Sequence, residues 1–190
     1  YNPDYIIFPT CINRVVSTDN SDVSSSEYIV KIAEKASLKV LMMDKSYDLC
    51  CGMAFSSKGY TKSGGIIQGM LIDQIKKAYR KYKVPIIIDM SPCTETIRMS
   101  MNSEQIKIMD SLDFLNTIKT RLSIKKLNLT CYVHSVCSDQ SVGDTSIIHS
   151  IAQNCVEFIE EKKEDFCCGM GGDRGLKYPE LTKNSIKRSV

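Results

Sequence analysis

Cysteine is the residue type on which the chemistry of this chain depends. The 190 residues include nine cysteines, against two histidines and no tryptophan. An odd number of cysteines cannot all pair in disulfides within the chain, and a chain of this length can bury a core without disulfide staples. In a reducing compartment, clustered cysteines are typical of metal ligands or of redox chemistry. The spacing of the cysteines therefore indicates which chemistry to expect.

Seven of the nine cysteines recur in a repeated pattern. An apolar segment ends in Cys11 near the N-terminus, and a similar segment ends in Cys137. The sequence Cys-Cys-Gly-Met begins at Cys50 and again at Cys167. One more cysteine, Cys93, follows the first pair, and the equivalent position of the second copy, near 210, lies beyond residue 190. We therefore expect the second copy to be truncated before its third cysteine.

Apolar segments that favour strands alternate with amphipathic segments between these cysteines. Short β-branched runs predict strands, and apolar residues repeated every three or four positions predict helices. The expected strands are 5–8, 40–43, 84–90, 106–109, 127–134 and 155–159, and the expected helices are 28–36, 67–82, a segment after Pro92, 112–122 and 146–153. This alternation is typical of a parallel sheet covered on both faces. We predict an α/β fold of two Rossmann-like βαβ repeats with parallel sheets, residues 1–125 and 126–190, the second one truncated.

The repeated cysteines follow the predicted strands, and ligands bind at the carboxyl ends of the strands in parallel sheets. Thiolates are soft ligands that select iron–sulfur clusters or zinc. Neighbouring side chains cannot easily bind one small tetrahedral ion, but they can reach different irons of a cluster. The adjacent pairs therefore favour a cluster over zinc. The candidate metal ligands are Cys11, Cys50, Cys51, Cys93, Cys137, Cys167 and Cys168.

Three alternatives stay open for these thiols. The first is a zinc- or thiol-stabilised scaffold that docks a partner and transfers no electrons. The second is a pocket lined by reduced thiols, and the third is thiol–disulfide catalysis at the adjacent pairs, which needs a thiolate of lowered pKa although no Lys or His adjoins either pair. Cys131 and Cys155 are expected in the core as small hydrophobes. His134 is a candidate ligand, proton carrier or buried hydrogen-bonded group.

The rest of the composition excludes several classes of partner. Lys and Arg number 25 against 22 Asp and Glu, a formal net charge of +3, which is too small to predict binding to nucleic acid or to an anionic membrane. The chain has no run of about 18 apolar residues, so no transmembrane segment is predicted. Nothing resembles a secretory signal peptide. We expect a cytoplasmic location, either free or peripheral on the inner face of the membrane.

Longer motifs surround the cysteines. They are Pro9-Thr10-Cys11-Ile12-Asn13-Arg14, Cys50-Cys51-Gly52-Met53 with Ser56-Ser57-Lys58-Gly59-Tyr60, Asp89-Met90-Ser91-Pro92-Cys93-Thr94, and Gly172-Asp173-Arg174-Gly175 with Pro179-Glu180-Leu181-Thr182. With the two copies of Cys-Cys-Gly, they resemble the cysteine-rich CCG domain that occurs in heterodisulfide reductase and in the anaerobic glycerol-3-phosphate dehydrogenase. The resemblance is strongest to FAD-linked D-lactate dehydrogenases and glycolate-oxidase-like enzymes, and it covers nearly the whole chain.

The resemblance implies the electron-transfer region of a modular oxidoreductase. It implies an iron–sulfur cluster of the 4Fe-4S type held by the thiols, and an FAD domain of the same polypeptide that oxidises a 2-hydroxy acid, D-lactate in particular. It also implies a quinone or a cytochrome as the electron acceptor. The family carries a further cysteine-bearing segment at the C-terminal end. The CCG domain of heterodisulfide reductase has a Cys-x-x-Cys pair where this chain has Cys93 alone.

Overall fold

The structure of the chain is a computed structural model that describes residues 2–15, 23–134, 146–160, 168–171 and 174–187. Contacts between segments divide the chain into two units, residues 1–123 and 124–190, and each unit is described by itself. The division predicted from the sequence falls after residue 125. Among the described residues we find no helix with the length and apolar character that a membrane crossing requires.

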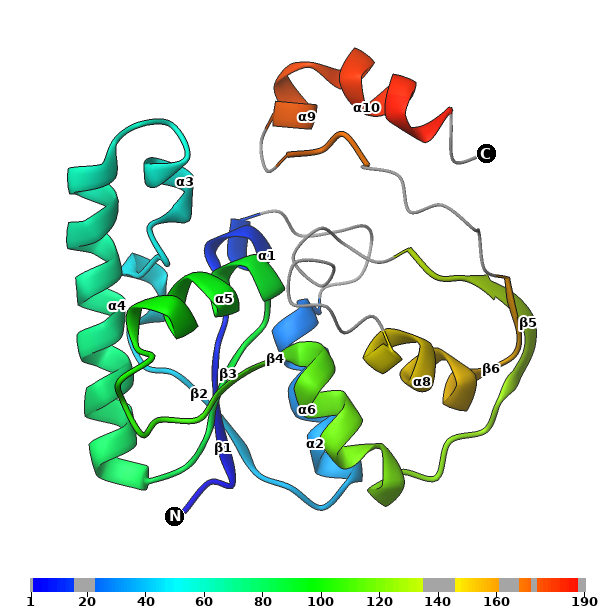
Figure 1. Cartoon of the computed structure of the whole chain (residues 1–190). Helices are drawn as coiled ribbons and strands as arrows, with labels where there is room; N and C mark the ends of the chain where they lie inside the picture. The colour runs from blue at the N-terminus through cyan, green and yellow to red at the C-terminus, as the bar shows by residue number, and fades with distance from the viewer. Residues whose placement is uncertain (1, 16–22, 135–145, 161–167, 172–173, 188–190) are drawn as a thin grey trace. The chain divides into compact units, whose positions relative to one another are not determined.

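The first unit is built on a parallel sheet of four strands in the order β2-β1-β3-β4 (Figure 1). The strands are β1 (Tyr5–Phe8), β2 (Val40–Met42), β3 (Ile86–Ile88) and β4 (Ile108–Asp110). In the central strands, every residue except Tyr5 is buried. Buried residues on both faces are typical of a parallel sheet that helices cover on both sides. The predicted α/β class is therefore confirmed.

Two layers of helices enclose this sheet, and alternate strand residues face each layer. On one face lie α2 (Ser25–Lys35) and α6 (Ser111–Ile118), and on the other lie α4 (Thr61–Tyr82) and α5 (Ser91–Ser100). The first layer buries Ile7, Ile29, Ala33, Ile87, Met109, Phe114 and Ile118. The second buries Ile6, Phe8, Leu71, Ile75, Ile86, Ile88 and Ile97, together with two cysteines.

Several element boundaries differ from those predicted. α2 begins at Ser25, because Ser24 and Glu27 form a capping box ahead of its apolar stripe. α4 begins at Thr61. The prediction began it at 67, because the first five residues of the helix carry no apolar side chain and so give no helical periodicity. The segment between the expected strand 40–43 and the expected helix 67–82, where no helix is predicted, contains the short helix α3 (Met53–Ser56). Other short elements are α1 (Cys11–Val15), η1 (Ser46–Asp48) and η2 (Lys119–Arg121).

The second unit contains another parallel strand pair, β5 (Leu127–Tyr132) and β6 (Val156–Glu160). The helix α8 (Ser146–Cys155) lies between these strands in sequence, and α9 (Arg174–Lys177) and α10 (Pro179–Ile186) follow. Cys155 ends α8 instead of opening a strand, and both Cys131 and Cys155 are half-buried. Neither cysteine is buried, so the prediction that they are core residues was wrong.

Candidate functional site

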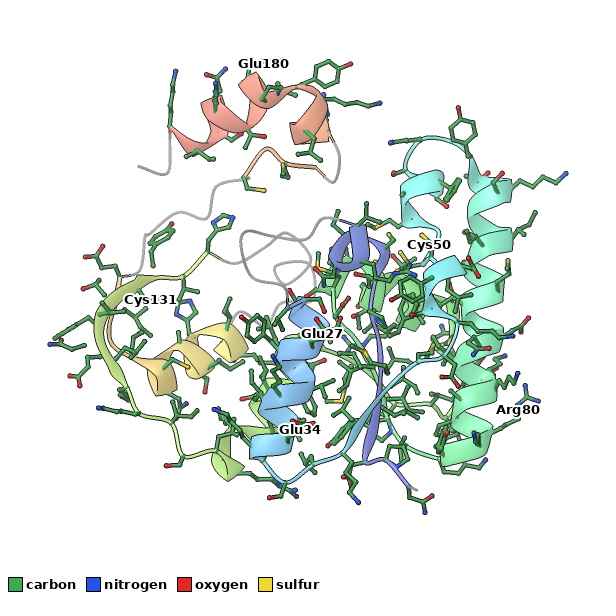
Figure 2. The ribbon with its side chains drawn as sticks, turned by 180° about the vertical axis from the view of Figure 1, so that it is seen from behind. Glu27, Glu34, Cys50, Arg80, Cys131 and Glu180 are labelled. Atoms are coloured by element: carbon green, nitrogen blue, oxygen red, sulfur yellow. The ribbon has the colours of Figure 1, made fainter. Side chains whose placement is uncertain are left out.

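Four cysteines lie at the carboxyl edge of the first sheet. Cys11 begins α1 after β1, Cys93 lies in the first turn of α5 after β3, and the pair of Cys50 and Cys51 follows β2 and η1. Because β2, β1 and β3 are neighbours in a parallel sheet, their carboxyl ends meet at the same edge. Figure 2 shows Cys50 at this end of the sheet. Residues far apart in the sequence thus bring their thiols together.

The four thiols lie close enough for their charges to affect one another's pKa. The Sγ atoms of Cys51 and Cys93 lie 3.1 Å apart. The Cys11 and Cys51 thiols both act to raise the pKa of Cys50, and the sulfur of Cys50 accepts a hydrogen bond of 3.4 Å from the N–H of Gly52. Cys51 is 3% exposed and Cys93 8%, whereas Cys11 and Cys50 are half-buried. The chain of thiols therefore runs from a partly accessible outer pair to a buried inner pair.

The inner pair has a thiolate of lowered pKa. Hydrogen bonding to Cys93 lowers the pKa of Cys51 to about 6, although burial acts in the opposite direction. The same hydrogen bond, followed by burial, raises the pKa of Cys93 far above its usual range. Burial raises the pKa of Cys50 to about 11. Two thiols in contact share one proton, because a second negative charge beside the first is unfavourable. The sequence places no Lys or His beside the pair. In the structure, the thiol of Cys93 stabilises the Cys51 thiolate instead.

The glycine of the first Cys-Cys-Gly-Met motif fixes the loop of the adjacent cysteines against α4. Gly52 has φ of +82°, a conformation that L side chains rarely adopt. A β-carbon at Gly52 would lie 2.3 Å from the carbonyl oxygen of Gly64, and one at Gly64 would lie 2.3 Å from Oγ of Ser56. Nε2 of Gln68 also donates a hydrogen bond of 3.2 Å to the carbonyl of Cys51. Two glycines and one amide therefore hold this loop on the helix.

Arg14 connects the Cys11 helix to the same loop. Its guanidinium donates to the carbonyl of Leu49 at 2.7 Å and to the carbonyl of Ser46. The guanidinium carbon also lies 5.9 Å from the ring centroid of Phe8 and 5.8 Å from that of Tyr47, within the range of a cation–π contact. Since Leu49 directly precedes the adjacent cysteines, Arg14 sets the position of Cys11 relative to them.

Asp89 joins the ends of the two central strands. Its buried carboxylate accepts a hydrogen bond of 2.9 Å from the N–H of Thr10 and another from the hydroxyl of Ser26. Its own carbonyl accepts a hydrogen bond of 3.1 Å from Oγ of Ser111. Because Thr10 precedes Cys11, this carboxylate fixes the backbone from which the first thiol projects.

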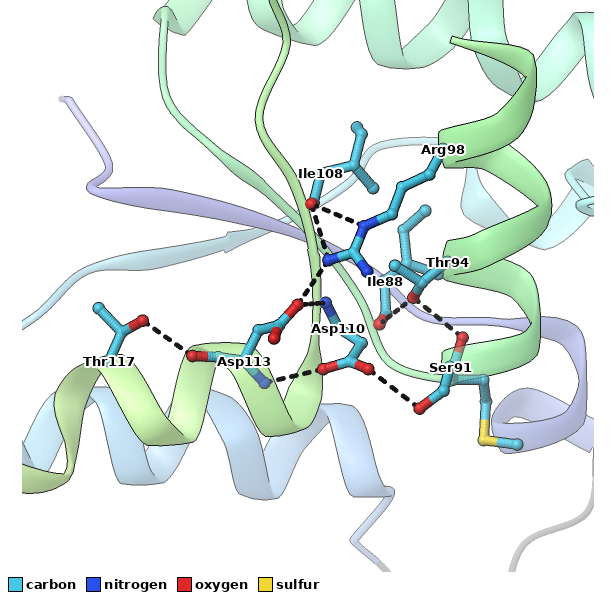
Figure 3. Close-up of polar contacts among 9 residues, drawn as sticks. Ile88, Ser91, Thr94, Arg98, Ile108, Asp110, Asp113 and Thr117 are labelled. Carbon is cyan, nitrogen blue, oxygen red and sulfur yellow. Dashed lines mark hydrogen bonds and ion pairs between the residues drawn. The ribbon is translucent and has the colours of Figure 1, made fainter. Parts of the chain in front are cut away.

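A polar network holds the start of α5, which carries the fourth thiol (Figure 3). Oγ of Ser91 donates to Asp110 at 3.0 Å, and Asp110 accepts from the N–H of Asp113 at 2.8 Å. Arg98, on α5, forms an ion pair of 2.5 Å with Asp113. The network therefore ties the first and last turns of α5 to the first turn of α6.

The second Cys-Cys-Gly-Met motif repeats the glycine packing of the first. Gly169 has φ of +72°, and a β-carbon there would lie 2.9 Å from the carbonyl oxygen of Leu181 and 2.6 Å from Oγ of Ser185. Leu181 and Ser185 follow this glycine by 12 and 16 residues (181 and 185 minus 169). Gly64 and Gln68 follow the first glycine by the same separations. The sequence repeat thus extends to the contact between the motif and the helix that follows it.

The other predicted ligands are placed only in part. Cys168 is exposed, and Cys137 and Cys167 lie outside the described residues. His134 is half-buried. The structure thus brings together four of the seven predicted ligands, all in the first unit.

The four thiols match a metal centre in donor type but do not match a single ion in spacing. Among the described residues, no three or more His, Cys, Asp or Glu side chains are arranged to hold a metal ion. Two thiolates on one tetrahedral zinc lie about 3.8 Å apart when each Zn–S bond is about 2.3 Å. The inner sulfurs, at 3.1 Å, are closer than that. The donor set suits soft metals and clusters.

Sequence reasoning did not assign a role to several residues that build this site. Arg14 and Asp89 belong to motifs that were identified in the sequence. A motif does not indicate which atoms its polar residues contact. Gly64 and Gln68 lie on α4, outside every cysteine motif. The sequence signal in this part of α4 is the pair of glycines at 64 and 65, because glycine is unfavourable in a helix.

A comparison of the chain with protein-family models, with curated proteins and with solved structures found no significant match.

Proposed function

We propose that this chain is the iron–sulfur electron-transfer region of an FAD-linked 2-hydroxy-acid dehydrogenase, with D-lactate as the hydroxy acid. One observation carries the metal part of the proposal: the thiols of Cys11, Cys50, Cys51 and Cys93 meet at the carboxyl edge of one parallel sheet. The four soft donors come from three separate segments, which follow β1, β2 and β3. Their convergence favours a centre that needs several thiolates.

The surrounding residues support an electron-transfer role for these ligands. An iron–sulfur cluster bound there would supply a one-electron carrier. The N–H of Gly52 donates to the sulfur of Cys50, and hydrogen bonds to cluster sulfurs tune the reduction potential. Burial of Cys51 and Cys93 keeps water from the inner thiols. The half-buried Cys11 and Cys50 leave a side from which a partner can approach.

The flavin part of the proposal depends on the motif resemblance. The motifs around Cys11, Cys50 and Cys93 resemble those of FAD-linked D-lactate dehydrogenases. We therefore place the oxidation of the hydroxy acid on a flavin domain of the same polypeptide, and the exit of electrons at a quinone or cytochrome. In this scheme the protein works in the cytoplasm or at the inner face of the membrane, and the first unit relays electrons between these partners.

Anaerobic reconstitution of the 190-residue chain with ferrous iron and sulfide tests the metal part. We expect bound iron, acid-labile sulfide and a sulfur-to-iron charge-transfer absorption band. Cys51→Ser is expected to lose most of the iron, while Cys155→Ser, at a half-buried thiol of the second unit, is expected to keep it. Binding of zinc but no iron would support the scaffold alternative, and binding of neither metal would overturn the metal site.

The flavin part needs the polypeptide that carries the FAD domain. With D-lactate as substrate, Cys51→Ser is expected to leave reduction of the flavin intact and to abolish electron transfer to a quinone analogue. Unchanged quinone reduction in this variant would exclude an electron-transfer role for the thiols.

A further inference from the structure

The geometry points to a second use of the inner thiols: Cys51 and Cys93 are a reversible oxidation site that closes to a disulfide when the chain is metal-free and meets a hydroperoxide. This inference goes beyond the proposed metal centre and does not depend on it. It concerns the reduced, metal-free chain, whose thiol contacts are the ones described above.

The distance between the two sulfurs carries this inference. A disulfide needs an S–S bond of about 2.05 Å, so sulfurs that lie 3.1 Å apart have to approach by only about 1 Å. The backbone that carries each thiol is held in place by the surrounding structure. Gln68 and the Gly52–Gly64 contact hold the loop of Cys51, and Cys93 belongs to the first turn of α5.

The adjacent thiol of Cys50 is a poorer partner for Cys51. Cys50 is adjacent in the chain, and consecutive α-carbons lie about 3.8 Å apart across a trans peptide. That separation is below the range of about 4.4–6.8 Å found between the α-carbons of a disulfide. A bond between Cys50 and Cys51 would therefore distort the backbone. Cys93 reaches Cys51 from another element and needs no such distortion.

Burial decides which oxidant the pair can meet. Cys51 and Cys93 are 3% and 8% exposed, so a large disulfide such as oxidised glutathione meets the half-buried Cys11 and Cys50 first. Hydrogen peroxide is small enough to reach a thiol with little exposed surface. We therefore assign hydroperoxides as the oxidant class.

The reaction balances with one peroxide per disulfide. The Cys51 thiolate attacks one peroxide oxygen, the O–O bond breaks, and the products are a sulfenic acid and hydroxide. The Cys93 sulfur then attacks the Cys51 sulfur, the S–O bond breaks, and water leaves. In total two thiols and one hydrogen peroxide give one disulfide and two water molecules, and two electrons pass from sulfur to oxygen. A dithiol reductant reverses the change by thiol–disulfide exchange.

Peptide mapping of the chelator-treated, fully reduced 190-residue chain tests the site. After equimolar hydrogen peroxide and alkylation of the remaining thiols, we expect two of the nine thiols to be lost and both to return with dithiothreitol. Trypsin leaves Cys50 and Cys51 on one peptide, 46–58, and Cys93 on another, 84–98. Cys50→Ser is therefore needed, and it is expected to keep the cross-link between these two peptides.

Further variants complete the test. Cys51→Ser is expected to lose that cross-link, and Cys93→Ser to trap a sulfenic acid on Cys51 that dimedone labels. Cys155→Ser is the matched control and is expected to behave as the parent chain. A dominant cross-link from Cys11 to peptide 46–58, or peroxide treatment that leaves Cys51 and Cys93 reduced, would overturn the inference. Because the measurement contains no iron, its result is independent of whether the chain binds a cluster.

Discussion

A β-carbon on Gly52 would lie 2.3 Å from the carbonyl oxygen of Gly64. Two backbone segments thus approach each other where no side chain fits. The contact presses the loop of the adjacent cysteines against α4, and Gln68 of the same helix donates a hydrogen bond to Cys51. α4 therefore positions the adjacent thiols although it carries no cysteine itself. The glycine of the Cys-Cys-Gly motif is needed for close packing as well as for its backbone conformation.

Gly52→Ala is expected to lower the free energy of unfolding of the first unit by about 2–4 kcal/mol. About 1–2 kcal/mol comes from placing an L residue at a left-handed φ, and the rest from displacing the backbone of α4, which resembles overpacking. Urea unfolding followed by circular dichroism measures the change. Gly59→Ala is the matched control, because Gly59 has φ of +86° and a β-carbon there would meet no atom within 4 Å. Equal losses in the two variants would show that the close approach contributes nothing.

Arg14→Lys is expected to destabilise the first unit by about 1–2 kcal/mol although the charge is kept. Lysine cannot reproduce the forked geometry with which Arg14 binds the carbonyls of Ser46 and Leu49, and unpaired buried acceptors are costly. Arg80→Lys is the control, because Arg80 is exposed and its hydrogen bond among the described residues is to the carbonyl of Lys76 in its own helix. Urea unfolding of both variants gives the difference, and a change below about 0.5 kcal/mol at Arg14 would contradict the assigned role.

Asp89→Ala is expected to cost about 2–3 kcal/mol, because the buried N–H of Thr10 and hydroxyl of Ser26 lose their acceptor. Asp89→Asn keeps one acceptor oxygen and is expected to recover part of this loss. The thiol count measured with a chromogenic disulfide in the folded chain gives a second readout, since release of the Thr10 backbone is expected to expose Cys11. Equal stability of the Ala and Asn variants would mean that Asp89 does not act through these hydrogen bonds.

The sequence predicted the sheet from the periodicity of its apolar residues, and it predicted the edge on which the thiols meet from the topology of a parallel sheet. The buried run at 86–88 and the cysteines that follow strands are local signals, and a parallel sheet places strand ends together by its topology. Boundaries were less predictable where polar residues form the element. α4 begins with the polar and glycine residues 61–65, which carry no apolar signal, and Gly64 in this turn packs closely against Gly52 and Ser56.

The inner thiol pair could not be predicted from the sequence. Cys51 and Cys93 lie 42 residues apart, and nothing local indicates that Cys93 is closer to Cys51 than Cys11 is. Their contact depends on the position of the loop that carries Cys51, which packs on Gly64 and accepts a hydrogen bond from Gln68 of α4. The lowered pKa of Cys51 has the same origin, because its main cause is the Cys93 thiol and not a charged neighbour in the sequence.

The stability of the reduced, metal-free chain is expected to depend on pH in two opposite ways. The pKa of Cys51 is lowered to about 6 in the folded state, so between pH 6 and the usual thiol pKa near 9 the unfolded chain binds more protons, and stability rises with pH. The pKa of Cys50 is raised to about 11 and that of Cys93 is also raised, so above pH 9 the folded chain holds more protons and stability falls.

Urea unfolding at a series of pH values, together with the ultraviolet absorbance of thiolate, measures this dependence. Cys93→Ser removes the thiol that stabilises the Cys51 thiolate, and it is expected to shift the thiolate signal to higher pH and to flatten the rise in stability between pH 6 and 9. Cys155→Ser should leave both curves unchanged. A thiolate signal that does not move in Cys93→Ser would separate the lowered pKa from the contact between the two sulfurs.

Oxidation of the inner pair is expected to stabilise the first unit by about 4 kcal/mol. The disulfide would close a loop of 42 residues, and the loss of chain entropy in the unfolded state predicts a gain of that size for such a loop. The gain is expected only where the native sulfurs can close without strain, which their separation of 3.1 Å favours. Urea unfolding of peroxide-treated and dithiothreitol-treated chain measures it, with Cys93→Ser as the variant in which the two treatments should give the same midpoint. A destabilised oxidised chain would mean that closing the disulfide distorts the loop held by Gln68 and Gly64.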